Sequence, residues 1–248
     1  MISIIIPTRN EESILEKTLL QFKKMTLPHE VIVSDGNSTD KTLAIARAHA
    51  DKVIEATPGE KQNIAIGRNT GSRSATGDIL GFFDADCTLV DPDTFFTQAL
   101  KHFETDLKQD AHAQKKSIVA LIPAIRVLPE METLADKIIW SYINIQYAVM
   151  NNMFNIGIAG GEFQMMRAAD FKAVGGYRED LAASEDVDLM HRLSKRGKIR
   201  LERELTVYHT GRRAHKTGWT KLIYVCVVNT LSLWIFGKSK STEWKVVR

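Results

Sequence analysis

Two aspartates separated by one small residue, Asp84-Ala85-Asp86, directly follow the apolar run at residues 79–83. Carboxylate oxygens in this spacing suit a divalent cation with oxygen ligands, such as Mn²⁺ or Mg²⁺. The same residues also fit a turn whose aspartate caps a helix beginning near Pro92. Their position at the end of a buried strand favours the metal site, with Asp84 and Asp86 as ligands.

Two further apolar runs end in polar residues. The run at residues 2–6 is followed by Pro7, Thr8, Arg9, Asn10 and Glu11, and the run at 31–34 is followed by Asp35 and Gly36. Ligands of open parallel sheets bind beyond the carboxyl ends of the strands, so we expect the three clusters to converge on one crevice. Asp35 could accept a hydrogen bond from a base or a ribose hydroxyl, or form an Asx-turn.

A second acidic cluster, Glu185, Asp186 and Asp188, lies in the first turn of a helix predicted at residues 184–196. Carboxylates stabilise a helix N-terminus through the helix dipole. A helix N-terminus also places a carboxylate at the edge of a cleft, so both a structural and a chemical role are open.

The elements that must position these groups alternate regularly in the first half of the chain. Strands are predicted at 2–6, 31–34, 53–54 and 79–83, and helices at 14–22, 40–48 and 61–74. Strands alternating with helices predict a parallel, doubly wound sheet. In the second half we expect strands at 117–125, 162–166 and 205–209, and helices at 130–153, 184–196 and 220–236.

The composition of the 248 residues is that of a globular protein, with 44% hydrophobic and 25% charged residues. Such a balance excludes wholesale disorder and fibrous or disulfide-based folds. A net charge of +3 gives no reason to expect nucleic acid as a partner. The two cysteines, Cys87 and Cys226, are far apart, so we expect no disulfide framework or zinc site, and a reduced, cytoplasmic setting. No signal peptide or uninterrupted membrane-spanning run is expected.

Five segments in order resemble glycosyltransferase family 2, whose members have the GT-A fold. They read SIIIPTRNEE, VIVSDGNSTDKT, GRNTGSRSATGDILGFFDAD, GGEFQMMRAADFKAVGGYRED and SEDVDLMHRL, and the resemblance covers roughly residues 2 to 213. It implies a single Rossmann-like, mostly parallel sheet flanked by helices. It also implies an inverting transfer of a sugar from a nucleotide-diphosphate donor of the UDP or GDP type to a hydroxyl acceptor, with Mn²⁺ or Mg²⁺.

The resemblance assigns roles to particular residues. The metal held by Asp84 and Asp86 would neutralise the leaving diphosphate, and His209 would be a further ligand. The general base would be Asp186, with Glu185 as the alternative. The positions that match nucleotide-sugar-binding residues are Pro7, Thr8, Arg9, Glu11, Asp35, Lys61, Arg68, Asn69, Asp84, Ala85, Asp86, Gly160, Gly161, Arg212 and Arg213. Solvated surface positions remain the alternative for Lys61, Arg68 and the Arg212-Arg213 pair.

The apolar segment 222–236 is flanked by lysines and ends the chain's second half, which also contains the apolar stretch 138–158. At about 15 residues the first segment is too short to span a hydrocarbon core of about 30 Å. It could lie on an anionic membrane surface. Packing on the domain or on a second copy in a homodimer is the alternative. Two apolar helices near a sugar-transfer site suggest a lipid-linked acceptor and a peripheral position on the cytoplasmic face of a membrane.

We therefore expect a GT-A domain at 1–215, divided into a nucleotide-binding half (1–90) and an acceptor half (91–215), and a helical extension at 216–248. Two other functions compete with the transferase. A sugar nucleotidyltransferase needs a glycine-rich loop after the first strand, and residues 7–11 contain no glycine. A non-catalytic, membrane-associated nucleotide-sugar-binding module would be expected to lack carboxylates that are present here.

Overall fold

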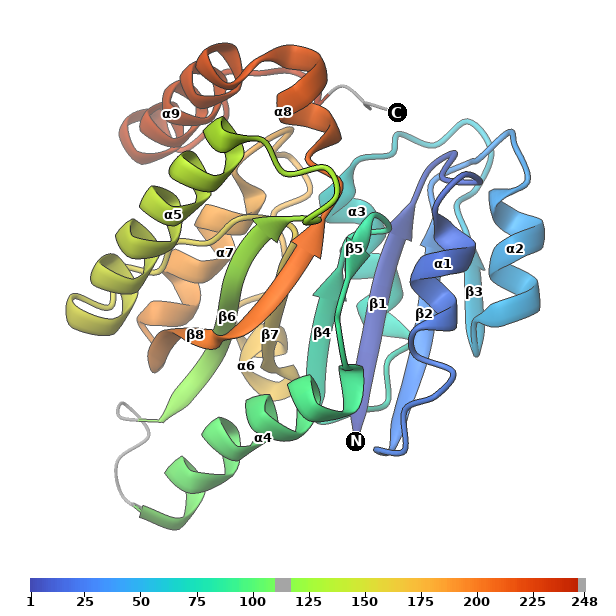
Figure 1. Cartoon of the computed structure of the whole chain (residues 1–248), viewed down its shortest axis with the longest axis horizontal. Helices are drawn as coiled ribbons and strands as arrows, with labels where there is room; N and C mark the ends of the chain where they lie inside the picture. The colour runs from blue at the N-terminus through green and yellow to red at the C-terminus, as the bar shows by residue number, and fades with distance from the viewer. Residues whose placement is uncertain (110–116, 245–248) are drawn as a thin grey trace.

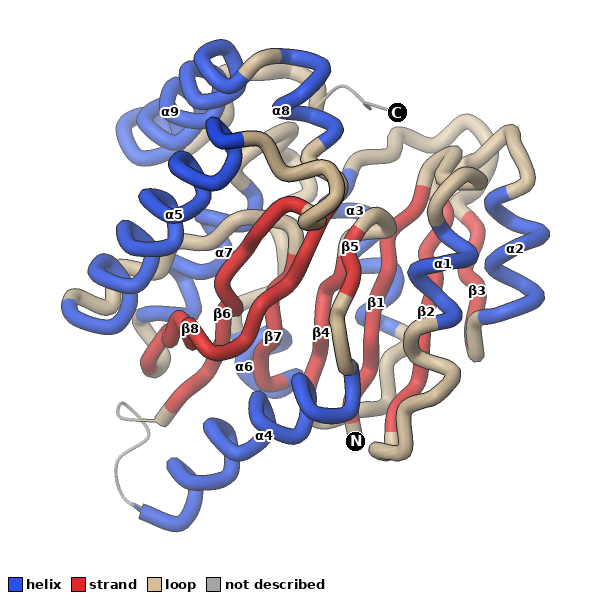
Figure 2. The backbone as a smooth tube through the Cα atoms, in the orientation of Figure 1, coloured by secondary structure: helices blue, strands red, loops and turns tan. Residues whose placement is uncertain are grey.

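The computed structural model describes residues 1–109 and 117–244. Within them, an eight-stranded sheet has the order β3-β2-β1-β4-β7-β6-β8-β5, and helices cover both of its faces (Figures 1 and 2). The first four strands are mutually parallel: β1 (Ile2–Thr8), β2 (His29–Asp35), β3 (Lys52–Glu55) and β4 (Ile79–Phe83). The predicted α/β class with a mostly parallel sheet is confirmed.

The second half of the chain makes the sheet mixed. Its strands are β5 (Cys87–Thr88), β6 (Ile118–Val127), β7 (Phe163–Arg167) and β8 (Lys198–His209). Strand β7 runs antiparallel to both of its neighbours, β4 and β6, whereas β6 and β8 are parallel. Because β7 pairs with β4, Glu162 and the Gly160-Gly161 turn that precede it lie beside the residues that follow β4.

Strand β1 shows why its sequence is almost continuously apolar. Successive side chains of a strand point to opposite faces. Ile2, Ile4 and Ile6 belong to one hydrophobic core and Ile5 to the other. Both faces of this central strand are therefore covered, as is typical of parallel sheets.

Helices on the two faces supply the rest of the two cores. On one face pack α1 (Leu15–Leu20), α2 (Thr42–His49), α4 (Pro92–Gln109) and α5 (Leu134–Ala148). On the other pack α3 (Ile64–Arg73), α6 (Ala168–Ala173) and α7 (Glu185–Ser194). The carboxyl ends of β1, β2 and β4 all reach the edge of the sheet above which α8 (Arg212–Thr217) and α9 (Trp219–Phe236) lie (Figure 1).

The helix predicted at 130–153 begins and ends differently. Thr133 and Asp136 form a capping box, so α5 begins at Leu134. The helix continues into a π-helical turn, η2 (Val149–Met153). The strand predicted at 205–209 is the last part of β8, which begins at Lys198 and contains a register shift opposite Pro123 and Ala124.

A buried carboxylate joins the C-terminal helices to α5. Asp136 is fully buried; its Oδ2 lies 2.7 Å from His215 Nε2, and its Oδ1 accepts a hydrogen bond of 2.7 Å from Trp219 Nε1. Burial acts to raise the pKa of Asp136, but the partners Thr133, His215 and Trp219 lower it to about 2. The extension predicted at 216–248 is thus held to the domain by Trp219 and by His215, which directly precedes it.

Helix α9 has an inner and an outer face. Asn229 and Leu233 are buried against the protein, and Asn229 exchanges hydrogen bonds with Ser241 over 2.8 and 2.9 Å. The helix is 18 residues long, because it begins at Trp219, and by length and composition it qualifies to cross a membrane. The expected apolar run of about 15 residues, 222–236, is thus extended at its start by a first turn that contains Lys221.

Candidate active site

Arg68 connects the two acidic motifs at the centre of the site. This residue comes from α3, and its side chain is only 1% exposed. Its Nη1 donates to Glu185 Oε1 over 3.0 Å, and its Nη2 donates to Asp84 Oδ1 over 3.0 Å. Nη2 also donates to the Gly161 carbonyl over 2.7 Å. The side chain predicted to face a diphosphate is therefore engaged in bridging β4, α7 and the turn before β7.

Asp84 follows β4 directly, and its side chain is 30% exposed. Burial raises the pKa of Asp84 to about 7; Arg68 opposes this shift, and the charge of Asp86 adds to it. A carboxyl with this pKa exchanges its proton near neutrality. A nearby cation would favour its charged form.

Asp86 is linked to the segment that follows β8. Its Oδ2 accepts a hydrogen bond of 2.6 Å from Thr210 Oγ1 and lies 3.1 Å from Arg212 Nε. The same guanidinium makes a bidentate pair with Glu11, over 2.7 and 2.9 Å. Arg212 thereby joins the loop after β1 to the aspartate motif.

His209, the last residue of β8, lies opposite Cys87 in the register and hence beside Asp86. Its Nε2 is buried and has no hydrogen-bond partner in the described part of the chain. Burial lowers the pKa of His209, which favours the neutral imidazole that ligates metals. The two carboxylates match the oxygen ligands that Mn²⁺ and Mg²⁺ prefer, and the imidazole would add one nitrogen ligand. In residues 1–109 and 117–244, however, no three His, Cys, Asp or Glu side chains already form a metal-binding cluster.

Asp186 lies beside Glu185 but has a different environment. Burial, followed by the charge of Glu185, raises the pKa of Asp186 well above its usual value. One carboxylate oxygen accepts a hydrogen bond of 2.8 Å from the Val187 backbone N–H. No ion pair to Asp186 occurs among the described residues, whereas Glu185 is paired with Arg68. Among the two neighbouring carboxylates, Asp186 is therefore the one that is not held by an ion pair in the described part of the chain.

The Gly160-Gly161 turn is shaped by the polar groups around it. A Cβ added to Gly161 would lie 3.1 Å from Arg68 Nη2 and 3.6 Å from Asp186 Oδ2. A Cβ added to Gly160 would overlap Glu162 Oε2. Glycine at both positions leaves room for Arg68, Asp186 and Glu162 to approach the turn.

On the donor side, the Asp35 side chain is held within its own loop, but by a residue three positions on rather than the two of an Asx-turn. Its oxygens accept hydrogen bonds from Thr8 Oγ1 over 3.0 Å and from the Ser38 N–H over 2.8 Å, and Asp35 is 2% exposed. Thr8 and Asp35 are paired across β1 and β2, so the two strand ends do converge. Pro7 is buried next to Gly67, and Arg9 is exposed beyond them.

Asn69 holds a turn of the second half. Its Nδ2 donates to the Tyr177 carbonyl over 2.8 Å, and its Oδ1 accepts from the Tyr177 N–H over 2.9 Å. Its amide is therefore occupied by the protein, and its predicted contact with a donor stays a prediction.

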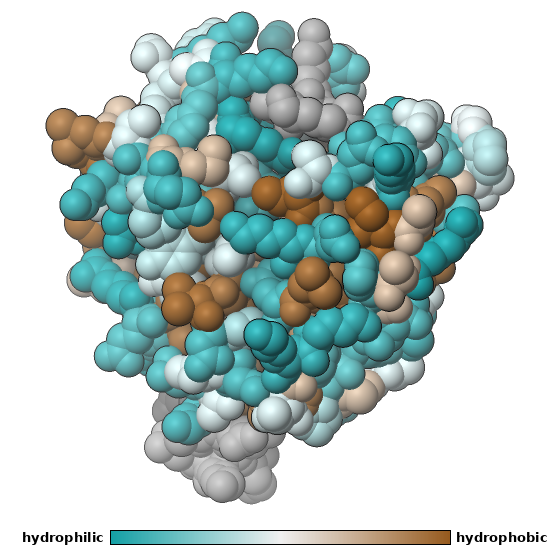
Figure 3. Space-filling view, turned by 45° about the vertical axis from the view of Figure 1, so that its right-hand side comes forward, coloured by the Kyte–Doolittle hydropathy of each residue, from teal (hydrophilic) through white to brown (hydrophobic). Residues whose placement is uncertain are grey.

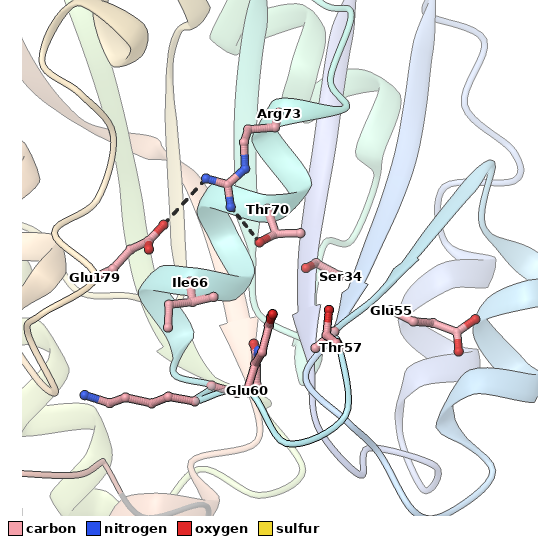
Figure 4. A pocket seen from close by; sticks show the side chains of 11 residues that line it. Ser34, Glu55, Thr57, Glu60, Ile66, Thr70, Arg73 and Glu179 are labelled. Atoms are coloured by element: carbon pink, nitrogen blue, oxygen red, sulfur yellow. Dashed lines mark hydrogen bonds and ion pairs between the residues drawn. The ribbon is translucent and has the colours of Figure 1, made fainter.

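Lys61 lines a separate pocket of about 390 Å³ beside the crevice (Figure 4). Its walls include Glu55, Thr57, Glu60, Thr70, Arg73 and Glu179, but none of the aspartates or glutamates that Arg68 joins. Arg73 points toward Glu179 and Thr70, from which its guanidinium nitrogens lie 3.6 and 2.9 Å. Lys61 thus does not lie with Asp84 and Asp86, in keeping with the alternative of an exposed surface position.

Three residues near Asp186 were not predicted: Tyr147, Glu162 and Cys226. Burial, then Glu162 and Asp186, raises the pKa of Tyr147 well above its usual value. Burial, then Asp186 and Glu162, raises the pKa of the Cys226 thiol to about 11, although Cys226 is exposed as a residue. Only Glu162 had a sequence signal, because it directly follows the Gly-Gly turn.

Arg213 and Ser184 complete the rim that α8 and α9 form. The Arg213 guanidinium lies 4.4 Å from the centroid of the Trp244 ring. Ser184, which precedes α7, has a left-handed backbone with φ of 62°, and its Oγ lies 3.5 Å from Thr230 Oγ1 on α9. Helix α9 therefore borders the crevice on the side of Asp186.

Comparison with known proteins places this chain in a family. Residues 3–175 match the family described as "Glycosyl transferase family 2". A curated relative, 4,4'-diaponeurosporenoate glycosyltransferase of Staphylococcus haemolyticus, is 26% identical over 95% of this chain and 66% of its own length. Across the curated relatives reported first, this chain spans about half to two thirds of their length.

Solved structures share the fold. The mannosyltransferase PcManGT from Pyrobaculum calidifontis, in complex with GDP-Man and Mn²⁺, has a TM-score of 0.65 and 19% identity, over 93% of this chain and 61% of that one. TarS 1-349 of S. aureus, in complex with UDP-GlcNAc, has a TM-score of 0.60 and 19% identity, over 84% and 57% of the two chains. These likenesses establish the expected GT-A-like arrangement of the sheet and its helices.

Proposed function

The chain belongs to glycosyl transferase family 2, and on that basis we propose that it transfers a sugar from a nucleotide-diphosphate donor to a hydroxyl acceptor. One observation carries this proposal. Arg68 holds a strand-end aspartate, Asp84, and a helix-start glutamate, Glu185, in one crevice, with Asp186 beside them. This arrangement would place Asp84 on the side of the leaving diphosphate and Asp186, as proton acceptor, on the side of the attacking hydroxyl.

On the leaving-group side, Asp84 and Asp86 would hold Mn²⁺ or Mg²⁺, with His209 as a further ligand. When bound, the cation would neutralise charge that develops on the diphosphate. The unpartnered His209 Nε2 and the neutral-range pKa of Asp84 support a cation at this position. Arg212 and Arg213, at the start of α8, add positive charge beside Asp86 for the same phosphates.

On the acceptor side, Asp186 would accept the proton of the attacking hydroxyl. Its raised pKa makes it a stronger base than an ordinary aspartate, and it lacks the ion pair that occupies Glu185. Attack from this side, opposite the diphosphate, would invert the anomeric configuration of the sugar. Identification of the product anomer by nuclear magnetic resonance would test inversion.

The nucleoside would lie over the ends of β1 and β2, where Pro7, Thr8, Arg9, Glu11 and Asp35 converge. Donors of the UDP or GDP type are proposed, because PcManGT was solved with GDP-Man and TarS with UDP-GlcNAc. Asp35 accepts three hydrogen bonds, from Thr8 Oγ1, the Ser38 N–H and Ser38 Oγ, and a carboxylate can accept about four, so capacity for one more remains.

For the acceptor we propose a lipid-linked or membrane-borne molecule. The outer face of α5 presents Leu134, Ile138, Tyr142 and Ile145, which are 52% to 74% exposed. The outer face of α9 presents Ile223, Tyr224, Val227, Leu231, Trp234, Ile235 and Phe236, which are 41% to 69% exposed. The two helices meet where Trp219 packs on Trp140, with ring centroids 6.0 Å apart, so the apolar faces belong to neighbouring elements.

The surroundings of this apolar surface favour a bilayer as its occupant. Exposed Lys137, Lys216, Lys221, Lys238 and Lys240 lie on or next to the two helices. Lysines beside exposed Trp and Tyr suit the anionic headgroups of a membrane interface. By contrast, the face seen in Figure 3 is mainly hydrophilic, with small and separate apolar patches.

A peripheral position fits α9 better than a membrane-spanning one. Its inner face carries the buried Asn229, whose hydrogen bonds with Ser241 hold the following segment against the helix. A spanning helix would have to leave these contacts and those of Trp219 with Asp136. We therefore propose that the protein is cytoplasmic and lies on the membrane surface. The competing arrangement is a homodimer formed through the same outer faces of α5 and α9.

Donor hydrolysis tests the function as a whole. Purified protein is incubated with UDP-glucose, UDP-GlcNAc or GDP-mannose, with Mn²⁺ or with a chelator, and free nucleoside diphosphate is measured. We expect slow release from at least one donor that requires the metal. Binding without release would favour the non-catalytic module, and formation of a nucleotide sugar from a sugar phosphate and a nucleoside triphosphate would favour the nucleotidyltransferase.

A further inference from the structure

Glu162 has a buried carboxylate oxygen to which no described residue donates a hydrogen bond. Within the described residues, its Oε2 is shielded from solvent and has no hydrogen-bond partner. Its backbone is fixed, because the Glu162 carbonyl accepts a hydrogen bond of 3.0 Å from the Asp84 N–H. A buried acceptor without a partner destabilises a folded protein, so its presence at this point indicates a ligand.

Glu162 lies between the aspartates Asp84 and Asp86, where we place the diphosphate, and Asp186, where we place the acceptor hydroxyl. It is opposite Asp84 where β7 pairs with β4, and its charge acts on Asp86 and on Asp186. The anomeric carbon of a transferred sugar must lie between a diphosphate at Asp84 and Asp86 and an acceptor hydroxyl at Asp186. The ring that bears this carbon would therefore pass next to Glu162.

The chemistry of the carboxylate limits the kind of group that Glu162 can bind. A carboxylate only accepts hydrogen bonds, and sugar hydroxyls donate them. Gly160 leaves the space beside Oε2 empty of side-chain atoms, and the Tyr147 hydroxyl borders it, at 3.7 Å from where a Gly160 Cβ would be. The turn before β7 thus carries a fixed acceptor with a phenol beside it.

We propose that Glu162 is a specificity-determining residue that accepts a hydrogen bond from a ring hydroxyl of the transferred sugar, with Tyr147 beside it. This inference rests on the proposed function and adds the contact that recognises the sugar rather than the nucleotide. It separates the donor site into a nucleotide part at β1 and β2 and a sugar part at the start of β7.

The test compares Glu162→Gln and Glu162→Ala with the wild-type protein. Titrations with Mn²⁺ use UDP, GDP, UDP-glucose, UDP-GlcNAc and GDP-mannose. We expect the affinity for the preferred nucleotide sugar to fall about tenfold or more in both variants, as for a lost hydrogen bond to a charged group, while the affinity for the matching nucleoside diphosphate stays within about twofold. Donor hydrolysis without acceptor should fall in parallel.

Thermal unfolding separates this role from a structural one. Neutralising an unpartnered buried carboxylate should leave the melting temperature unchanged or raise it, whereas removal of a structural partner would lower it. Glu60→Gln, an exposed carboxylate in the neighbouring pocket, is the matched control and should change neither binding nor hydrolysis.

Three results would overturn the inference. Equal losses for nucleoside diphosphate and nucleotide sugar, or weaker Mn²⁺ binding, would make Glu162 part of the metal site. If the variants change only the KM for an acceptor, Glu162 contacts the acceptor molecule and not the transferred sugar. Unchanged binding and hydrolysis would leave Glu162 without a substrate contact. If the wild-type protein binds none of the five nucleotides, the proposed function fails and the inference with it.

Discussion

Glu185 Oε1 lies 3.0 Å from Arg68 Nη1, and both side chains are almost completely shielded from solvent. This contact fixes the first turn of α7 to α3, and it leaves the next residue along the chain, Asp186, without a cation of its own. The two adjacent carboxylates therefore have different environments: Glu185 is held by Arg68, and Asp186, for which we propose the role of proton acceptor, has no ion pair among the described residues.

Asp186→Asn should lower the rate of sugar transfer by about 10²- to 10⁴-fold, because the amide keeps the shape but cannot take the proton. Donor affinity and melting temperature should stay close to the wild-type values. Single-turnover kinetics with saturating donor measure the rate. In the wild-type protein the acid limb of the rate profile should lie above the usual aspartate range, since the pKa of Asp186 is raised.

Glu185→Gln is the matched comparison. It breaks the buried pair with Arg68, and loss of one partner of such a pair costs about 3–5 kcal/mol. Calorimetry should show a clearly lower melting temperature for Glu185→Gln and an unchanged melting temperature for Asp186→Asn. The assignment of the base would be wrong if the two results were exchanged.

Asp86→Ala should abolish metal-dependent binding of nucleoside diphosphate, because it removes a proposed ligand and releases Arg212 and Thr210. Titration of UDP or GDP with Mn²⁺ and with a chelator measures this effect. Asp78→Ala serves as the control, since the Asp78 side chain is 92% exposed. Equal nucleotide affinity with and without metal in the wild-type protein would contradict the metal site.

The Asp136 network predicts a specific loss of stability in acid. The pKa of Asp136 is about 2 in the folded protein and 3.8 without its partners, so its contribution is complete above pH 3.8 and disappears as the pH falls through 2. The shift corresponds to about 2 kcal/mol. The free energy of unfolding, measured with urea, should fall between pH 5 and pH 2 in both proteins. In the wild-type protein it should fall by about this amount more than in Asp136→Asn.

That experiment has an internal check. Trp219 donates to Asp136, so its fluorescence reports whether the start of α9 detaches. If Asp136→Asn follows the same pH dependence as the wild-type protein, the network does not cause the acid sensitivity.

Trp234→Ser with Ile235→Ser should prevent sedimentation with anionic vesicles, because these side chains are 55% and 69% exposed on the outer face of α9. Melting temperature and nucleotide affinity should not change, since neither residue faces the protein. Val90→Ser, at a position that is 86% exposed outside α5 and α9, is the matched control. If the wild-type protein ignores all vesicles but elutes as a dimer that the double variant converts to a monomer, the apolar face binds a second copy instead.

The sequence was most informative where a strand ends in polar residues. Alternation of apolar runs and helices was enough to predict that Asp35 and Asp84 would lie at one edge of the sheet, because parallel strands leave their carboxyl ends together. The antiparallel insertion of β7 between β4 and β6 could not be predicted, since it depends on pairing between distant segments. That pairing is what brings Glu162 beside Asp84.

Side-chain partners were harder to predict than positions. Arg68 and Asn69 were expected to face the donor, but their partners, Glu185 and Tyr177, come from the second half of the chain. Asp136 carried no sequence signal beyond a helix cap, because its contacts with His215 and Trp219 arise only when α8 folds back on α5. Propensity and spacing describe single elements and contain no information on such long-range contacts.

The difference between the two cysteines allows site-specific labelling of the unmodified protein. Cys87 is buried in the sheet, and Cys226 is exposed on α9, the helix that borders Asp186. A maleimide fluorophore should therefore attach to one position, and slowly at neutral pH, because the thiolate is the reactive form and partial shielding of the thiol group, then Asp186 and Glu162, raises the pKa of Cys226 to about 11. Protection of this thiol by a bound acceptor would give a direct assay for acceptor candidates without any knowledge of the sugar.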